Sequence, residues 1–184
     1  GRGARPLLLR EPGSTPLGER VRAILLDPAT GALEPISEAL LFNACRAQMV
    51  KTEIRPALAA GRFVLLDRYA DSTAAYQGGG GGADATALEA MARAATGGLS
   101  PDLVLLLDLS PAEAAARRRR ASDRMEARDP AYYERVRARY LAIAASPARS
   151  SNFEILDAAL PPADVFDAAR SALENRFPEI RAKT

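Results

Sequence analysis

The chain has 184 residues and a formal net charge of +2, with one cysteine and no histidine. This length suits a single domain spanning residues 1–184, and so small a charge gives no support to nucleic-acid binding. The cysteine and histidine counts exclude an intramolecular disulfide and an ordinary zinc site, and no apolar run approaches the roughly 20 residues of a membrane span, so we expect a cytoplasmic protein.

Four short aliphatic runs alternate with helical patterns along the chain. The runs cover residues 6–9, 62–67, 103–108 and 153–156, and each is bounded by Gly, Pro or polar residues, as buried parallel strands are. Helices are predicted to begin at Pro16, near Ser37 (ending near Ala60), and at Asp84, Pro111, Pro130 and Pro162. This alternation predicts an α/β fold with a parallel sheet. The run of glycines at residues 78–82 is predicted to be a flexible surface turn.

The first predicted strand leads into the polar stretch Arg-Glu-Pro-Gly-Ser-Thr at residues 10–15. One interpretation is a turn that only caps the following helix, because Thr15 and Pro16 suit the cap and the first helical position. The other is a loop that lines a pocket, since open α/β sheets bind ligands at the carboxyl ends of their strands. On this second interpretation Arg10, Glu11 and Pro12 are candidate substrate-binding residues.

Phe42 and Arg46 lie four residues apart in the second predicted helix and therefore share one face of it. An aromatic ring and a guanidinium on one face can stack on a base and donate hydrogen bonds to its exocyclic oxygens. The alternative is a core phenylalanine beside a solvated arginine. Cys45 faces away from both side chains and is expected to be a small core residue.

The second predicted strand delivers Asp67 and Arg68 at its carboxyl end, and the polar segment after it finishes in Tyr76-Gln77-Gly78. The planar guanidinium of Arg68 suits a pair of phosphate oxygens, and Asp67 can orient it or help to hold a magnesium ion through water. The alternative is a strand end followed by an ordinary helix cap at Asp71 or Ser72.

Arginines at positions 117–120, followed by Asp-Arg-Met-Glu at 123–126, end the helix after the third predicted strand. Three interpretations stay open. Cations suit a helix carboxyl terminus, so the cluster can be a solvated helix end. It can be a nucleic-acid patch, although no aromatic residues are interleaved. It can also be a lid that brings arginines over a triphosphate and stabilises charge on the transferring group.

Taken together, Phe42, Arg46 and residues 67–78 resemble the acceptor site of thymidylate kinases, with residues 10–15 matching the stretch Arg-Glu-Pro-Gly-Gly-Thr except for Ser14. The resemblance implies a P-loop nucleoside monophosphate kinase-like, three-layer α/β/α fold with a parallel sheet. It also implies phosphoryl transfer from ATP-Mg²⁺ to dTMP, giving dTDP, usually by a homodimer. One departure is that residues 78–82 contain no arginine, which the family often has in this turn.

The resemblance also implies roles for individual residues. Phe42 stacks on thymine, Arg46 and Thr73 contact the base, Arg68 binds the acceptor phosphate, and Tyr76 packs under the sugar and disfavours a 2′-hydroxyl. Ser72 and Gln77 belong to the same segment. The lid, at about residues 117–129, comprises Arg117, Arg118, Arg119, Arg120, Asp123, Arg124 and Glu126. The residues expected to act on the transferring phosphate are Asp67, Arg68, Arg120 and Arg124.

The P-loop pattern G-x-x-x-x-G-K-[ST] does not occur in these residues, because the only lysines, Lys51 and Lys183, follow Val50 and Ala182. The resemblance places a further strand, with the P-loop and its helix, before residue 1, and puts that strand centrally, between residues 62–67 and 103–108. We therefore expect an N-terminally truncated kinase that is inactive and poorly stable by itself. The alternative is a paralogue that holds a nucleotide or a partner without catalysis.

Overall fold

The strands of this protein form two parallel pairs in the computed structural model, which describes residues 6–117, 124–125 and 127–180. Strand β1 (Leu7–Arg10) pairs with β2 (Val64–Asp67), and β3 (Val104–Asp108) pairs with β4 (Phe153–Asp157). All four predicted strands are confirmed, with ends that shift by one or two residues. The register sets Arg10 opposite Asp67, so polar residues from both strands meet at the carboxyl edge.

The two pairs are not hydrogen-bonded to each other in the described part of the chain. The resemblance gives another strand a position between β2 and β3, and that strand stays a prediction. Aliphatic side chains on both pairs remain exposed, including Leu8, Leu65, Leu107 and Ile155.

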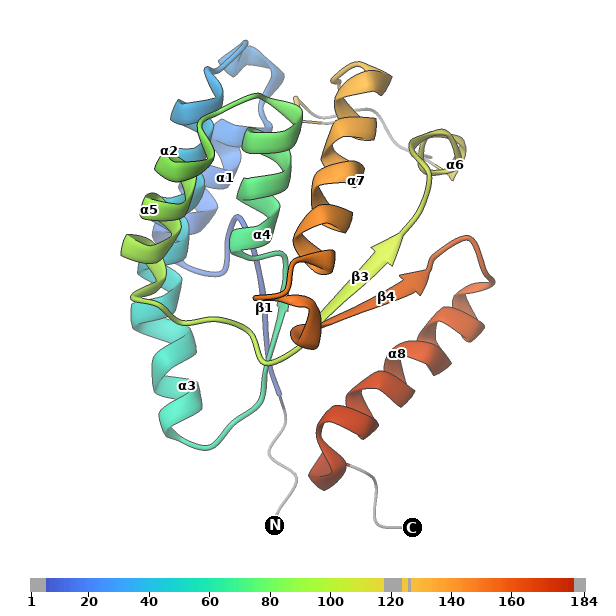
Figure 1. Ribbon diagram of the computed structural model, residues 1–184. Coiled ribbons are helices and arrows are strands. Elements are labelled where there is room, and N and C mark those ends of the chain that lie inside the picture. Colours follow the sequence, from blue (N-terminus) through green and yellow to red (C-terminus); the bar gives the residue numbers. More distant parts are fainter. Residues whose placement is uncertain (1–5, 118–123, 126, 181–184) are drawn as a thin grey trace.

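Helices alternate with these strands in the order expected from the sequence (Figure 1). The α-helices are α1 (Pro16–Leu26), α2 (Pro35–Met49), α3 (Arg55–Ala59), α4 (Ala70–Thr73), α5 (Ala85–Thr96), α6 (Pro111–Arg117), α7 (Pro130–Ala145) and α8 (Pro162–Arg176). Two π-helical segments, η2 (Val50–Ile54) and η3 (Ala74–Gly80), continue α2 and α4, and short 3₁₀ turns occur at η1 (Pro28–Thr30), η4 (Ser150–Asn152) and η5 (Pro178–Ile180). The predicted cap Thr15 accepts a hydrogen bond from the first turn of α1, and Asp84 and Asp129 do the same at the starts of α5 and α7.

The core of the β1–β2 side lies on one face of that pair. Leu9, Val64 and Leu66 pack against Met49 and Ile54, where α2 continues into η2. Alternate strand residues point to opposite faces, which explains why Leu8 and Leu65 are exposed. In Figure 1, α1, α2 and α5 stand together, while α4 and α7 lie side by side in front of the strands. Among the described helices, none is long and apolar enough to cross a membrane.

The glycine run is a correction to the sequence analysis, because it is not a flexible surface turn. Residues 78–80 belong to η3, which packs against α7. Gly80 is buried, and a β-carbon built on it would lie 2.6 Å from the ring of Tyr132 and 2.8 Å from Val136. Glycine is needed here because the two helical segments approach too closely for any side chain.

We predict that Gly80→Ala lowers the free energy of unfolding by about 1–3 kcal/mol, since the methyl group forces Tyr132 and Val136 to move. Gly78→Ala is the matched control, because its β-carbon would meet only one flexible methyl of Leu88, at 3.1 Å. Urea unfolding followed by circular dichroism measures both losses. Equal losses for the two variants would contradict the close packing of η3 on α7.

Candidate acceptor site

Two helical segments face each other across the candidate site. Arg46 on α2 donates a hydrogen bond to Thr73 Oγ1 at the end of α4, with a distance of 3.0 Å. Two turns earlier on α2, Glu38 accepts a hydrogen bond from Gln77 Nε2 on η3, at 3.1 Å. Positions 38, 42 and 46 share one face of α2, as positions 73 and 77 share one face of the facing helix. Phe42 therefore occupies the turn of α2 between the two bridges.

Arg46 is the most completely enclosed charge in the described structure, with a fully buried side chain. Its guanidinium binds both carboxylate oxygens of Glu11, which follows β1, and the shortest N–O distance is 2.7 Å. Nη1 lies 2.8 Å from Asn43 Oδ1, and Nη2 lies 3.2 Å from the carbonyl oxygen of Tyr69. Arg46 thus joins three chain segments, and its bond to a base stays a prediction.

Burial raises the pKa of Glu11, while the charge and hydrogen bonds of Arg46 act in the opposite direction. Each charge of the pair therefore offsets the cost of burying the other, because either charge alone would be costly in this position. Cys45 is buried with Val21 and Leu25, which confirms the expected core residue, but Phe42 packs against the same cluster, so Cys45 does not face away from Phe42 as the sequence analysis expected. Burial raises the pKa of its thiol to about 11.

Phe42 is half-buried and packs against the cluster of Val21, Leu25 and Cys45. One side of the ring is thus supported by the core, while part of its surface remains open. A supported ring with an open part is suited to stacking on a planar ligand. Stacking of Phe42 on a base stays a prediction.

The end of β2 turns sharply at Arg68, whose φ of 70° lies in the left-handed region that non-glycine residues seldom adopt. The guanidinium carbon of Arg68 lies 5.0 Å from the centre of the Tyr76 ring. Tyr76 in turn has edge contacts with Tyr132 and Tyr140 of α7. The turn thereby places Arg68 against the aromatic cluster, and both Asp67 and Arg68 are exposed at the strand end.

The remaining predicted substrate-binding residues have protein partners. Ser72 Oγ lies 2.7 Å from the hydroxyl oxygen of Tyr140. Arg10 forms an exposed ion pair with Glu19, at 3.1 Å, and together with Ser14 lines a hollow of about 380 Å³ beside β1. The carbonyl oxygen of Pro12 accepts a hydrogen bond from Arg22. Arg10 therefore ends β1, and Pro12 is buried in the loop that carries Glu11.

The segment predicted to be a lid is described only at its ends. Arg117 donates to the carbonyl oxygens of Ala158 and Ala159, at 2.6 and 3.0 Å, in the turn after β4. Arg124 is buried and donates to the carbonyl oxygen of Leu25 at 2.8 Å and to Glu38 at 2.6 Å. The other predicted lid residues, Arg118, Arg119, Arg120, Asp123 and Glu126, lie outside the described residues.

Several side chains in the site were not singled out from the sequence, above all Glu38, Asn43, Tyr140 and Arg128. Glu38 and Asn43 had a detectable signal, because they lie on α2 at helical spacing from Phe42 and Arg46. Tyr140 and Arg128 had none, since their partners lie far away in the sequence.

Comparison with known proteins identifies the family. A sequence model of the thymidylate kinase family matches residues 2–169. The chain belongs to the thymidylate kinase family. It is 48% identical over 182 residues to a thymidylate kinase of Desulfovibrio desulfuricans, covering 94% of this chain and 83% of the relative. It is 50% identical over 155 residues to one of Deinococcus radiodurans, covering 83% of this chain and 73% of that protein.

The fold gives the same result as the sequence. A crystal structure of thymidylate kinase from Ehrlichia chaffeensis superposes with a TM-score of 0.71 and 28% identity, covering 91% of this chain and 79% of that one. This confirms the predicted α/β kinase-like fold with parallel strands. In the described residues, no group of three or more His, Cys, Asp or Glu side chains is placed to hold a metal ion.

We predict that Arg46→Met lowers the free energy of unfolding by about 3–5 kcal/mol, because it leaves the Glu11 carboxylate buried without its partner. Changing Glu11 to Met as well should restore most of the stability, since no unpaired charge then remains. Urea unfolding of the two single variants and the double variant measures this recovery. Additive losses would show that the two side chains are not coupled.

The Arg46→Met variant should also respond to pH. Burial raises the pKa of Glu11, and losing Arg46 raises it further. Between the unfolded pKa of about 4.3 and this raised folded pKa, the folded protein holds a proton that the unfolded chain has released. Stability of the variant should therefore fall as pH rises, so its deficit is smaller at pH 5 than at pH 8. Equal deficits at both values would argue against a buried carboxylate.

Proposed function

We propose that this protein binds dTMP between α2 and the α4–η3 helix and takes part in phosphoryl transfer from ATP to its 5′-phosphate. The observation that supports this most is the arrangement of Phe42 between two polar bridges, Arg46–Thr73 and Glu38–Gln77. An aromatic ring flanked by buried polar groups is what a base needs for stacking and for hydrogen bonds. Family membership supports the same proposal.

In this proposal Arg68 binds the acceptor phosphate. Its guanidinium lies at the carboxyl end of β2, where ligands of open α/β sheets bind, and Tyr76 supports it through its ring. The phosphate oxygen that attacks the donor carries no proton to remove, so the absence of histidine is no obstacle. Positioning and charge neutralisation carry most of phosphoryl transfer, and both suit a supported arginine.

Tyr76 would set selectivity for the sugar, while Phe42 would pack the base. Tyr76 is held on two sides by Tyr132 and Tyr140, so its ring cannot easily move to accept a 2′-hydroxyl. A rigid neighbour excludes an added group better than a mobile one, because displacing it disturbs the packing of α7. This supports preference for a deoxynucleotide.

The binding of ATP, the phosphate donor, and of its magnesium ion has to be considered separately from the acceptor site. These 184 residues contain no G-x-x-x-x-G-K-[ST] segment, so they offer no cradle of that kind for ATP. A magnesium ion carried on nucleotide phosphates needs only one or two protein carboxylates, and Asp67 is the one that we propose. We also propose a homodimer, and a cytoplasmic location stays a prediction.

A second candidate is a protein that holds dTMP without transferring phosphate to it. It is the alternative that the sequence analysis left open, because these 184 residues contain no P-loop pattern. Both candidates use the same acceptor site, so they predict the same binding and differ only in turnover.

We predict that the protein binds dTMP more tightly than UMP, and that Arg68→Ala weakens dTMP binding by about tenfold or more, the loss expected for a charged hydrogen bond. Isothermal titration calorimetry measures both. Arg93→Ala is the control, because Arg93 forms only an exposed ion pair on α5 and should leave binding unchanged.

A coupled assay for ADP release then separates the two candidates. Turnover with ATP, Mg²⁺ and dTMP, lowered about a hundredfold or more by Arg68→Ala, identifies a kinase. Binding without turnover identifies the second candidate. Equal affinity for dTMP and UMP, or unchanged binding by Arg68→Ala, would contradict the acceptor site.

A further inference from the structure

Glu38 accepts hydrogen bonds from three side chains on two separate segments, although its own side chain is almost completely buried. Its Oε1 lies 2.6 Å from Arg124 Nη1 and 2.6 Å from Arg128 Nη2. Its Oε2 accepts from Gln77 Nε2 at 3.1 Å. A surface glutamate in the first turn of a helix would only balance the helix dipole, so this degree of enclosure needs another explanation.

The segment around Arg124 is fixed by more than the carboxylate. The backbone N–H of Arg124 donates to the carbonyl oxygen of Leu26, and its Nε donates to that of Leu25, both at the end of α1. The carbonyl oxygen of Met125 accepts a hydrogen bond from the hydroxyl of Tyr133. Neutral groups therefore set the position of the backbone, and Glu38 alone supplies the negative charge that the described side chains direct at Arg124.

The same carboxylate also reaches the acceptor site. Gln77 is buried and adjoins Tyr76, whose carbonyl oxygen accepts a hydrogen bond from Tyr132. Glu38 lies one helical turn before Phe42 on the same face of α2. One side chain is thus in contact with the segment that carries Tyr76 and with the segment that follows the arginine cluster.

We propose that Glu38 is a positioning residue that fixes Gln77 and the Arg124–Arg128 segment against each other, so that the base side of the acceptor site and this segment are ordered together. The proposal rests on the proposed function, because it treats the space beside Phe42 as the place of the base. A buried ion pair that only stabilises the fold is the competing explanation, and it predicts no effect on binding by the folded protein.

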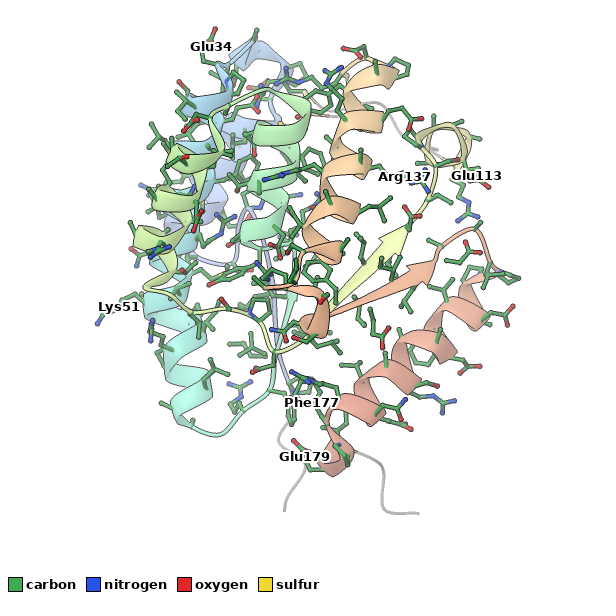
Figure 2. All side chains as sticks on the ribbon, in the orientation of Figure 1. Glu34, Lys51, Glu113, Arg137, Phe177 and Glu179 are labelled. Carbon is green, nitrogen blue, oxygen red and sulfur yellow. The ribbon has the colours of Figure 1, made fainter. Side chains whose placement is uncertain are left out.

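The test replaces Glu38 by Gln, which keeps its shape and removes its charge. Glu34→Gln is the matched control. It is the same substitution one helical turn earlier in the chain, at a residue that is exposed at the start of α2 (Figure 2). Two quantities are measured on folded protein. One is the dissociation constant for dTMP by calorimetry. The other is the rate of tryptic cleavage after Arg124 and Arg128, located by mass spectrometry.

For Glu38→Gln we expect dTMP binding to weaken about tenfold, which lies within the range of indirect coupling, and cleavage after Arg124 and Arg128 to accelerate by a similar factor. Arg128→Met should weaken binding by less than about threefold, since Arg124 then keeps the whole carboxylate. Glu34→Gln should change neither quantity. Lower thermal stability with unchanged binding and unchanged cleavage would overturn the proposal in favour of a structural ion pair.

A second variant covers the case in which Glu38→Gln does not fold. Glu38→Met combined with Arg124→Met leaves neither of these two charges unpaired, and such replacements are often tolerated. This variant should still bind dTMP weakly and be cleaved quickly after Arg128, and normal behaviour in both assays would overturn the proposal. If the unmodified protein does not bind dTMP, the proposed function fails, while the cleavage measurement still decides whether Glu38 fixes this segment.

Discussion

The ion pair between Arg46 and Glu11 is the interaction on which the rest of the site depends. It joins the loop after β1 to the last turn of α2, and through Thr73 and the Tyr69 carbonyl it also holds the chain that leaves β2. Two charges with almost no exposed surface are expensive to bury, and they are tolerated only because each donor finds an acceptor. The positions of β1, β2 and α2 are therefore interdependent at the carboxyl edge.

Helix α2 buries two different kinds of side chain as a result. Cys45 and Met49 enter apolar clusters, as in an ordinary core helix. Glu38, Asn43 and Arg46 are buried but polar. Buried polar groups specify a single geometry more strictly than apolar ones, since any displacement leaves a donor or an acceptor unpaired. A site that must hold a planar base in one orientation benefits from such strictness.

The sequence predicted the elements well wherever local chemistry decides them. Proline at the first helical position, as at Pro16 and Pro130, marked helix starts that the structure confirms. The strands were recognisable because aliphatic runs bounded by polar residues have few other uses. The glycine run was interpreted wrongly because its conformation depends on α7, some fifty residues later in the chain, and no local pattern shows that contact.

The residues of the candidate site likewise fall into those that local sequence patterns reveal and those that depend on distant contacts. Phe42 and Arg46 could be paired from their spacing alone, and Asp67 with Arg68 from their place after a strand. Glu38 has the same spacing, but an acidic residue in the first helical turn already has an ordinary explanation, so its spacing carried no weight. Its burial follows from Arg124, which lies 86 residues away. Partners at that separation are set by the tertiary fold, which the sequence patterns do not reveal.

The contacts of Arg117 and Arg124 also bear on how the arginine cluster works. Both belong to the predicted lid, and both donate hydrogen bonds to other parts of the protein. Arg117 donates to two carbonyl oxygens after β4, and Arg124 donates to the carbonyl oxygen of Leu25 and to the carboxylate of Glu38. Moving Arg124 to a phosphate would leave Leu25 without its donor and give Glu38 only Arg128, a loss that a solvated arginine would not incur. The described contacts of Arg124 are therefore those of a residue that holds its segment against α1 and α2. The role expected of Arg120 and Arg124 on the transferring phosphate stays a prediction, and for Arg124 it would require these hydrogen bonds to be broken.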